Sequence, residues 1–368
     1  MTYPRKAPLP IGANPGEIAG IGDQRSTDIT MQCAETRPQL DYTTTQQATA
    51  FAKRKFADEL AGRLRLMEID APPALPIGTG LHDDLAGTQT SVKFTPTDIG
   101  EPFQIVHSLA KWKRHQLGRL NTGVGSGLIT DMRAIRKEEV LSPTHSIYVD
   151  QWDWEQVIGP EDRSISFLKQ TVRAIYAALL ATQNALASEY GIEPVLDEEV
   201  SFVHTQTLED RYPDLASEER EEAWVKQEGS SFFIGIGHPL ESGQPHDVRA
   251  TDYDDWSTPT ELGRGLNGDL VVWHPEREEA LELTSMGIRV DAESLDYQLR
   301  IRSEEDKRDK PFHRELLDGK LPLTVGGGIG QSRVCMLLLR KVHIGQVQAG
   351  LWPEQMRRRL AAEGIELL

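Results

Sequence analysis

The sequence predicts an α+β fold, of the broad α/β type, in which an antiparallel sheet is flanked by helices. Two observations support this prediction. Along the chain, helical periodicity alternates with strand pairs joined by turns, and not with single strands followed by crossover helices. The sequence also shows no internal repeat and no linker strong enough to divide its ordered part. We therefore expect one large domain over residues 43–368, behind a flexible N-terminal tail over residues 1–42.

The composition limits the kinds of partner. The 368 residues include 57 Asp and Glu against 40 Lys and Arg, a net charge of −17, and the sequence pI is about 5.1. Because proteins that bind nucleic acid or an anionic membrane usually carry a basic face, we expect neither partner. No apolar stretch approaches the roughly 18 residues that span a bilayer. Cys33 and Cys335 match no disulfide or metal-ligand pattern, which favours a cytoplasmic location.

The ordered region is expected to begin with an amphipathic helix near Thr43. Phe56, Leu60 and Leu64 recur there at helical spacing among charged residues. The segment Leu66–Ala71 then alternates like a strand until two prolines end it. The tail before this helix is rich in Pro, Gly, Thr and charge, and it has no apolar core of the kind that a secretory signal requires.

The middle of the chain predicts a loop, two short strands, a helix and a hairpin. The loop is punctuated by glycines and carries more ionisable groups than a simple turn needs. In order, the expected elements are the loop at 77–87, strands at 92–94 and 103–106, a basic helix at 107–117, and a hairpin with strands over 128–136 and 145–155.

The second half predicts a long helix followed mainly by strands. Apolar residues mark one face of the segment after Ser166, which indicates the helix. The later elements are expected as strands at 201–204 and 232–237, a strand pair at 270–273 and 281–283 with a turn at Pro275, two short helices, a glycine-rich turn at 326–330, and an apolar helix at 334–339.

Three segments are more informative together than singly. They are the strand closed at Pro72, the Arg136-Lys137-Glu138 segment with the strand after its loop, and the glycine-rich segment Gly326–Arg333 that opens an apolar helix. In this order they resemble the three signature motifs of class II aminoacyl-tRNA synthetases. The resemblance implies the fold of that superfamily, an antiparallel sheet flanked by helices.

Each motif has a physical reason. An arginine on a rigid strand, such as Arg136, can hold the α-phosphate of ATP and stabilise the charge that gathers there during attack. Glycines before a helix let the backbone approach a nucleotide closely, and Arg333 behind them can lie against adenine or reach the phosphates. Neither a Rossmann nor a P-loop fingerprint is present. Singly, each motif also has a structural interpretation, so their order is what indicates a nucleotide site.

A closer resemblance covers residues 43–353. It is to the family of ammonia-dependent asparagine synthetase A enzymes, and it rests on long motifs that are rich in tryptophan. These are His107–Arg114, Tyr148–Glu155, His246–Arg249, Asp252–Pro259, Gly265–Asp269, Ser285–Asp291 and Gly326–Arg333.

This resemblance implies a ligase reaction in two steps. The side-chain carboxylate of L-aspartate attacks ATP to give a β-aspartyl adenylate and pyrophosphate, and ammonia then displaces AMP to leave L-asparagine. ATP and Mg²⁺ are the implied cofactors, and L-aspartate, ammonia and ATP are the implied substrates. Because the first motif of the superfamily lies at a two-fold interface, a homodimer is also implied.

The resemblance also directs the choice of residues for the nucleotide. Arg136 and Arg333 are expected to contact the α-phosphate and the adenine or γ-phosphate of ATP. Asp269 and Glu282 lie on consecutive predicted strands, and paired carboxylates suit a Mg²⁺ ion that bridges ATP phosphates.

The remaining candidates are expected to handle the amino acid and the amine. Lys113 and Gln151 could orient the reacting carboxylate, and Asp83 could act as a general base on ammonium or the attacking amine. The residues expected to bind the α-ammonium are Asp153 and Asp254, and those for the α-carboxylate are Ser285 and Arg289. The two aspartates could instead cap turns, and His145 could be structural or contact a phosphate.

One loop departs from the family pattern. That pattern is close to Gly-Asp-Gly-x-Gln-Asp-Asn-Leu-Ser-Gly, whereas residues 78–87 read Gly-Thr-Gly-Leu-His-Asp-Asp-Leu-Ala-Gly. Thr79, His82, Asp84 and Ala86 therefore differ. A carboxylate in place of an amide at Asp84 removes a donor and adds charge, which would change how the amine or the substrate carboxylate is held.

Two alternatives stay open at this stage. The changed loop is what a paralogue that ligates another amine or acid would show. An aminoacyl-tRNA synthetase-like enzyme would share the activation chemistry, although the acidic net charge speaks against tRNA binding. A glutamine-dependent enzyme is not expected, because neither Cys33 nor Cys335 has the setting of an amidotransferase nucleophile.

Overall fold

The computed structural model describes residues 40–83, 85 and 89–368, and residues 40–368 form one compact unit. Helix α1 (Tyr42–Leu64) opens this unit, and the Asp41 carboxylate caps it by accepting the Thr44 N–H at 2.7 Å. Its buried face includes Phe56 and Leu60, which confirms the predicted amphipathic helix. Of the predicted tail, residues 1–42, the first 39 residues lie outside the described part of the chain.

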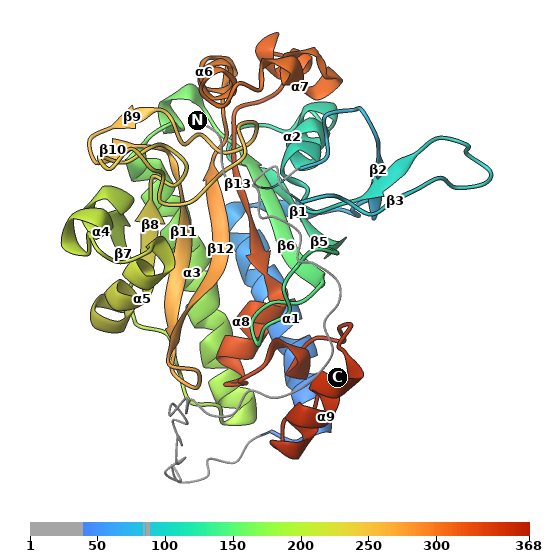
Figure 1. Ribbon diagram of the computed structural model, residues 1–368, viewed down its shortest axis with the longest axis vertical. Coiled ribbons are helices and arrows are strands. Elements are labelled where there is room, and N and C mark those ends of the chain that lie inside the picture. The colour runs from blue at the N-terminus through green and yellow to red at the C-terminus, as the bar shows by residue number, and fades with distance from the viewer. Residues whose placement is uncertain (1–39, 84, 86–88) are drawn as a thin grey trace, which may run out of the picture. The chain divides into compact units, whose positions relative to one another are not determined.

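An eight-stranded sheet, built from described residues, forms the centre of the unit (Figure 1). Its strands, in spatial order, are β1 (Leu66–Glu68), β5 (Gly127–Ile135), β6 (Tyr148–Val157), β13 (Thr324–Gly330), β12 (Glu279–Ile288), β11 (Asn267–His274), β8 (Ser231–Ile234) and β7 (Ser201–His204). Neighbouring strands are antiparallel except at the two edges, where β1 with β5 and β7 with β8 are parallel. The predicted antiparallel sheet is therefore confirmed, with parallel strands added at its margins.

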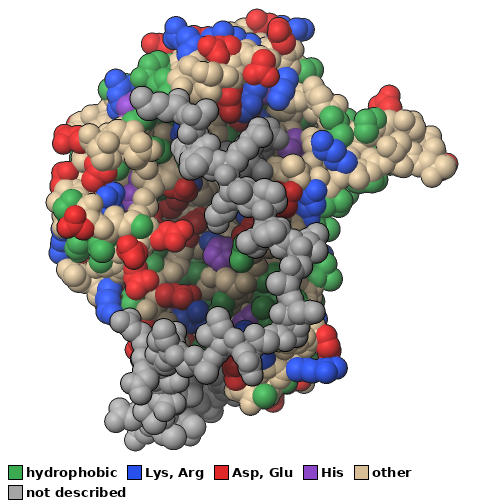
Figure 2. Space-filling view, viewed as in Figure 1, with side chains coloured by type: hydrophobic (Ala, Val, Ile, Leu, Met, Phe, Trp, Pro, Cys, Tyr) green, Lys and Arg blue, Asp and Glu red, His purple; other side chains and the backbone are tan. Residues whose placement is uncertain are grey.

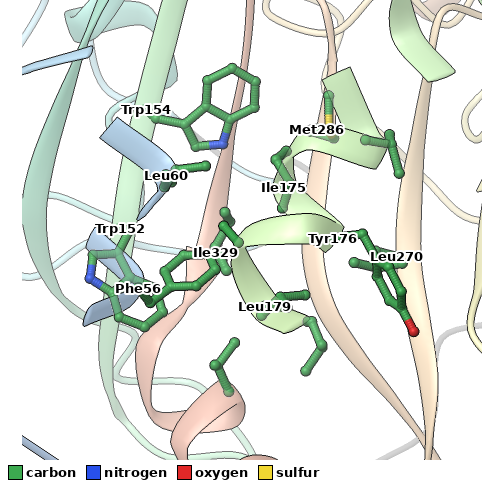
Figure 3. Packing of buried hydrophobic residues seen from close by; sticks show 14 of the residues in the cluster. Phe56, Leu60, Trp152, Trp154, Ile175, Tyr176, Leu179, Leu270, Met286 and Ile329 are labelled. Atoms are coloured by element: carbon green, nitrogen blue, oxygen red, sulfur yellow. The ribbon is translucent and has the colours of Figure 1, made fainter. Parts of the chain in front are cut away.

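Helices cover one face of this sheet. Figure 1 shows α1 and α3 (Ile165–Tyr190) behind the strands, and Figure 3 shows their apolar side chains packed against the sheet. Helix α8 (Gln331–Leu338) contributes to the same core. The other helices are α2 (Ala110–Arg119), α4 (Thr205–Arg211), α5 (Ser217–Glu228), α6 (Ala292–Arg302), α7 (Pro311–Leu317) and α9 (Glu354–Ala362), with 3₁₀ turns at Pro160–Asp162, Glu305–Asp309 and Ile344–Gln346.

Two smaller sheets flank the main one. They are a three-stranded sheet of β2 (Ala74–Pro76), β4 (Phe103–Ile105) and β3 (Lys93–Phe94), and a hairpin of β9 (Pro259–Thr260) and β10 (Gly263–Arg264). None of the helices formed by the described residues is both long and apolar enough to cross a membrane.

The central strands are two-faced. On β6, Trp152 and Trp154 belong to the apolar core, whereas Gln151 and Asp153 face a cavity on the other side. Because successive side chains on a strand point to opposite faces, the same strand supplies both core and site. The polar residues predicted for the site on this strand therefore lie on the face opposite α1 and α3.

Three expected elements are corrected. The glycine-rich segment was expected as a turn, but it forms the central strand β13 and runs directly into α8. At Gly326 a Cβ atom would collide with the Glu155 carboxylate, so the missing side chain makes room for a buried charge. The basic helix begins at Ala110 rather than at His107, and the strand expected over Leu66–Ala71 ends at Glu68.

We predict that Gly326→Ala destabilises the fold by about 1–3 kcal/mol, the usual cost of overpacking a tight site. The added methyl group would collide with the Trp154 carbonyl and the Glu155 carboxylate, and both are fixed in the sheet or in a buried ion pair. Urea unfolding measures the effect. The control is Gly62→Ala in α1, where an added Cβ meets nothing within 4 Å, and which should stabilise the helix by up to about 1 kcal/mol. Equal effects at both positions would contradict this account.

Candidate active site

A cavity of about 360 Å³ lies on the polar face of the sheet. Its walls come from β6, β12 and β13, from the residue after β5, from the first turn of α8, and from the segment 247–254. Figure 2 shows acidic side chains gathered over this face. The volume suits a small ligand, since such pockets usually measure roughly 300–1,000 Å³.

Most of the predicted site residues meet at this cavity. Eight line it: Arg136, Gln151, Asp153, Asp254, Glu282, Ser285, Arg289 and Arg333. The other three lie behind its wall, each bonded to a lining residue: Asp83 to Ala110, Lys113 to Asp153, and Asp269 to Arg249.

A β-bulge explains why Glu282 and Ser285 share one cavity. On a regular strand, side chains three residues apart point to opposite faces. Here Leu270 of β11 pairs with Thr284 while Val271 pairs with Glu282, so the ladder skips Leu283. The extra residue turns the strand and brings both polar side chains to the cavity.

Two arginines approach one end of the cavity. Arg136 Nη2 donates to the His107 carbonyl at 3.2 Å, while its buried Nε has no hydrogen-bond partner among the described residues. Arg333 Nη1 donates to the Glu282 carbonyl at 3.0 Å. Burial lowers the pKa of Arg136, and the neighbouring Arg333 charge adds to this effect. An anionic group in the cavity would relieve this repulsion and satisfy the free donors.

His145 supports Arg333 rather than offering a charge of its own. Arg333 Nη2 lies 2.8 Å from His145 Nε2, and because a guanidinium only donates, this ring nitrogen accepts. The imidazole is then neutral, with its proton on Nδ1, which lies 2.9 Å from the Ser142 hydroxyl. Burial and the Arg333 charge lower the pKa of His145, which agrees with that assignment. Of the two roles considered for His145, a structural role and a phosphate contact, this geometry fits the structural role.

Lys113 is fully buried beneath the cavity floor. Its ammonium donates to the Asp153 carboxylate and to the carbonyls of Trp154 at 2.9 Å and Gly327 at 3.0 Å, which uses all three protons. The Leu109 N–H donates to the second Asp153 oxygen at 3.0 Å. Burial raises the pKa of Asp153, and the Lys113 charge opposes this rise. Lys113 therefore fixes Asp153 and joins β6 to β13, and it has no proton left for a substrate.

Arg289 is held between two buried carboxylates. Its Nε and Nη2 donate to Glu155 at 3.1 and 2.8 Å, and its Nη1 pairs with Asp254. Despite burial, these carboxylates raise the pKa of Arg289. Burial alone would raise the pKa of Glu155, but Arg289 and Lys113 outweigh it and hold that pKa below its usual value. A guanidinium has five N–H groups, so two remain for a ligand in the cavity.

In the buried ion pairs around Arg289, carboxylates outnumber cations. These ion pairs form a cluster of the cations Lys113 and Arg289 with the carboxylates Asp153, Glu155 and Asp254. Burial raises the pKa of Asp254, as it does for Asp153, and the Arg289 charge opposes both rises. An ammonium group on a ligand would neutralise the cluster. This geometry supports the prediction that these aspartates bind an α-ammonium.

A second acidic group lies around Arg249, whose guanidinium pairs with Asp269 and Asp247. Burial raises the pKa of Asp269 to about 7, and Glu282 and Glu221 add to the rise while Arg249 opposes it. The Oδ1 atom of Asp269 is buried and has no hydrogen-bond partner among the described residues. A further cation would therefore be stabilised here.

The acidic group around Arg249 could bind Mg²⁺ only together with a bound ligand that supplies further oxygen atoms. Among the residues described, no set of three or more His, Cys, Asp or Glu side chains could hold a metal ion by itself. Mg²⁺ is commonly held by one or two carboxylates together with substrate phosphates and water. The unpartnered oxygen of Asp269 and the nearby Glu282 supply the protein's share of such a site.

Asp83 contacts the first residue of α2. Its Oδ2 accepts the Ser108 hydroxyl and the Ala110 N–H, the latter at 2.7 Å. Its Oδ1 is buried and has no hydrogen-bond partner among the described residues, with Lys111 Nζ at 3.8 Å. Ser108 and Ala110 line the cavity, so Asp83 lies one layer behind its wall.

Two of the four residues that depart from the family pattern, Thr79 and His82, are described by the structure. The Thr79 hydroxyl donates to the Pro76 carbonyl at 3.2 Å, which serves the local turn. The ring of His82 is 6% exposed and lies 4.9 Å from the ring of His107. Neither Thr79 nor His82 lines the cavity. Asp84 and Ala86 lie outside the described residues.

The sequence analysis missed two charged residues of this site. Glu155 ends the alternating series of polar residues on β6, and that alternation could have marked it as a partner for a buried cation. Arg249 closes the His246–Arg249 motif, which was recognised without giving the arginine a role. Its lining position and its bond to Asp269 now give it one.

Comparisons with known proteins give the family and the fold of this chain. The family model described as aspartate-ammonia ligase matches residues 43–364. The fold is similar to asparaginyl-tRNA synthetases in complex with asparaginyl-adenylate from Entamoeba histolytica, with TM-score 0.61, 14% identity and 85% of this chain and 68% of that chain covered. A second such complex, from Pyrococcus horikoshii, has TM-score 0.61 and 13% identity, with 84% and 70% covered.

An aspartyl-tRNA synthetase from Entamoeba histolytica is also similar, with TM-score 0.55, 14% identity and 83% of this chain and 57% of that chain covered. At these identities the likeness shows the fold, which is that of class II aminoacyl-tRNA synthetases, as predicted. The family match spans nearly all of the described residues and includes each residue that lines the cavity. This chain belongs to the aspartate-ammonia ligase family.

Proposed function

We propose that this protein forms L-asparagine from L-aspartate and ammonia, using ATP, through a β-aspartyl adenylate. The observation that carries the proposal is the meeting of two arginines and a negatively charged cluster at one cavity, in a chain of the aspartate-ammonia ligase family. The similar synthetase structures that hold asparaginyl-adenylate support an adenylate on this fold.

Activation places a carboxylate oxygen of aspartate against the α-phosphorus of ATP. That oxygen forms a bond to phosphorus, the bond to the bridging β-phosphate oxygen breaks, and pyrophosphate leaves. Arg136 would hold the α-phosphate oxygens with its unpartnered N–H, and Arg333 would contact the adenine or the terminal phosphate. Gln151 lines the cavity, and its amide lies against Gly328, where a Cβ atom would collide with it. This amide would orient the reacting carboxylate.

Amide formation then consumes the adenylate. The ammonia lone pair attacks the side-chain carbonyl carbon, the bond from that carbon to the AMP oxygen breaks, and the nitrogen loses a proton. Asp83 is our candidate for the proton acceptor, through its unpartnered Oδ1. Ser285 and the two spare N–H groups of Arg289 would hold the α-carboxylate, and the neighbouring Asp153 and Asp254 would hold the α-ammonium.

Asp269 and Glu282 would hold Mg²⁺ together with the ATP phosphates. When bound, the ion neutralises phosphate charge and so favours attack at the α-phosphorus. In this structure Arg249 forms an ion pair with Asp269. If Asp269 bound Mg²⁺ instead, the Arg249 guanidinium would be released to contact a phosphate.

Free ammonia is the proposed nitrogen source. Cys335 is fully buried, and burial raises the pKa of its thiol to about 12, which does not suit a nucleophile. Cys33 lies outside the described residues.

We predict that the affinity for Mg²⁺ falls as the pH falls below about 7, because protonated Asp269 cannot bind the ion. The native pKa of this carboxyl is raised, so it is protonated below that pH and ionised above it. The apparent affinity should drop by up to about tenfold per pH unit, measured as the Mg²⁺ concentration that half-saturates ATP binding at pH 6, 7 and 8.

The Glu221→Gln variant separates this effect from the titration of ATP itself, whose terminal phosphate also titrates near this range. Removing the Glu221 charge lowers the pKa of Asp269, so the midpoint of the pH dependence should move to lower pH while ATP is unchanged. The same midpoint in both proteins would show that the titration of Asp269 does not control Mg²⁺ binding.

The proposed function is tested by supplying the purified protein with L-aspartate, Mg²⁺, ATP and a panel of amines. With ammonium it should form asparagine and equimolar AMP and pyrophosphate. Amide formation with hydroxylamine, hydrazine or another amine, but not with ammonium, would instead identify a paralogue with another acceptor. Charging of tRNA in the same assay would support the synthetase alternative.

A further inference from the structure

A chain of buried polar and charged side chains connects α7 with Asp83, in the loop between β2 and β3. His313 Nε2 lies 2.9 Å from Asp252 Oδ2, and Lys111 Nζ lies 2.8 Å from the same oxygen. Lys111 Nζ is also 3.8 Å from Asp83 Oδ1. All four side chains are at most 2% exposed, so no solvent screens these charges.

The geometry makes Asp252 and Asp83 share one lysine. Because Asp252 Oδ2 only accepts, His313 Nε2 carries the proton between them. Lys111 and the His313 N–H together hold the pKa of Asp252 well below its usual value, although burial opposes them. The His313 bond therefore supplies part of the compensation that Asp252 needs, and it leaves Lys111 able to act on Asp83 as well.

The same helix supports the loop that carries Asp83. The Phe312 N–H donates to the Thr79 carbonyl at 3.3 Å. Gly80, at φ 78°, lies directly on α7, since a Cβ there would be 3.1 Å from His313 Nδ1 and 3.0 Å from Lys310 Cβ. Asp83 is thus held from one side by α7 and Lys111, and from the other by Ser108 and Ala110 at the cavity wall.

We propose that His313, acting through Asp252 and Lys111, positions Asp83 for the ammonia-consuming step and is not needed for activation of aspartate. None of His313, Asp252 and Lys111 lines the cavity, and none is hydrogen-bonded to Arg136 or Arg333. The inference rests on the proposed function, in which Asp83 accepts a proton from the attacking nitrogen. His313 is a positioning residue in this scheme.

The two half-reactions are measured separately in His313→Leu. Aspartate-dependent exchange of pyrophosphate into ATP reports activation, and it should stay within about twofold of wild type. The ammonium kcat/KM for asparagine formation should fall at least about tenfold, because displacement of a catalytic group is costly. His313→Gln keeps a donor for Asp252 and should recover most of the loss. An equal loss in both half-reactions, or in neither, would overturn the inference.

Two further variants control for folding. His274→Leu also replaces a fully buried histidine, one outside the cavity wall, and should leave the ratio of the two half-reactions unchanged. If His313→Leu does not fold, Asp252→Asn removes the shared charge with little change of volume. It should show the same selective loss, and an unchanged ratio would overturn the inference.

The proposed function and this inference fail in different ways. A wild-type protein that supports neither exchange nor asparagine formation would refute the proposed function. A wild-type protein that supports both, with a His313→Leu variant that matches it in the ammonium step, would refute only the role of His313.

Discussion

Replacing Arg136 by alanine is expected to slow adenylate formation by about 10²–10³-fold, which corresponds to a loss of about 3–4 kcal/mol of transition-state stabilisation. The Arg136 side chain faces the cavity. Among the described residues its buried Nε has no hydrogen-bond partner, and its Nη2 donates to the His107 carbonyl. Its removal therefore costs the fold little. Aspartate-dependent exchange of pyrophosphate into ATP measures the effect.

The control for this prediction is Arg136→Lys. Lysine keeps the positive charge but not the planar fork, so it should recover only part of the rate. Unfolding midpoints of both variants should match wild type. Near-normal exchange in the alanine variant would remove Arg136 from the α-phosphate site.

Replacing Glu155 by glutamine is expected to destabilise the fold by about 3–5 kcal/mol, the usual cost of breaking a buried ion pair by removing one partner. Arg289 would lose the buried carboxylate that accepts from both its Nε and its Nη2. The Thr324 hydroxyl would also lose a charged acceptor at 2.7 Å. Urea denaturation of the variant gives the change in the free energy of unfolding.

The matched control is Glu354→Gln on α9. Glu354 pairs with Arg358 at 2.8 Å, but both side chains are mostly exposed, at 68% and 78%. Exposed pairs of this kind contribute roughly 0.3–0.5 kcal/mol, so this variant should change little. A loss in Glu155→Gln no larger than in the control would show that the buried cluster is not essential to the fold.

The class of fold and eight of the residues that line the cavity could be predicted because their signals are local. Helical periodicity over Phe56 and Leu60 marks α1, and alternation along β6 separates Trp152 and Trp154 from Gln151 and Asp153. The motifs then identify which polar residues belong to a site. That information does not depend on how distant strands pair.

What the sequence could not predict depends on pairing across the sheet. The glycines of β13 look like a turn until Glu155 is placed beside Gly326. The bulge at Leu283 exists only relative to β11. From the sequence, Lys113 is a plausible substrate-binding residue. Only the structure shows that its ammonium donates to Asp153 and Gly327 instead.

The central claim is that aspartate is activated as an adenylate, and the fate of an oxygen atom tests it most directly. L-Aspartate labelled with ¹⁸O in its side-chain carboxylate is incubated with the protein, Mg²⁺, ATP and ammonium, and the products are analysed by mass spectrometry. Attack at the α-phosphorus predicts one ¹⁸O atom in AMP for each asparagine formed. Label in inorganic phosphate, with ADP as the other product, would show attack at the γ-phosphorus and contradict the account.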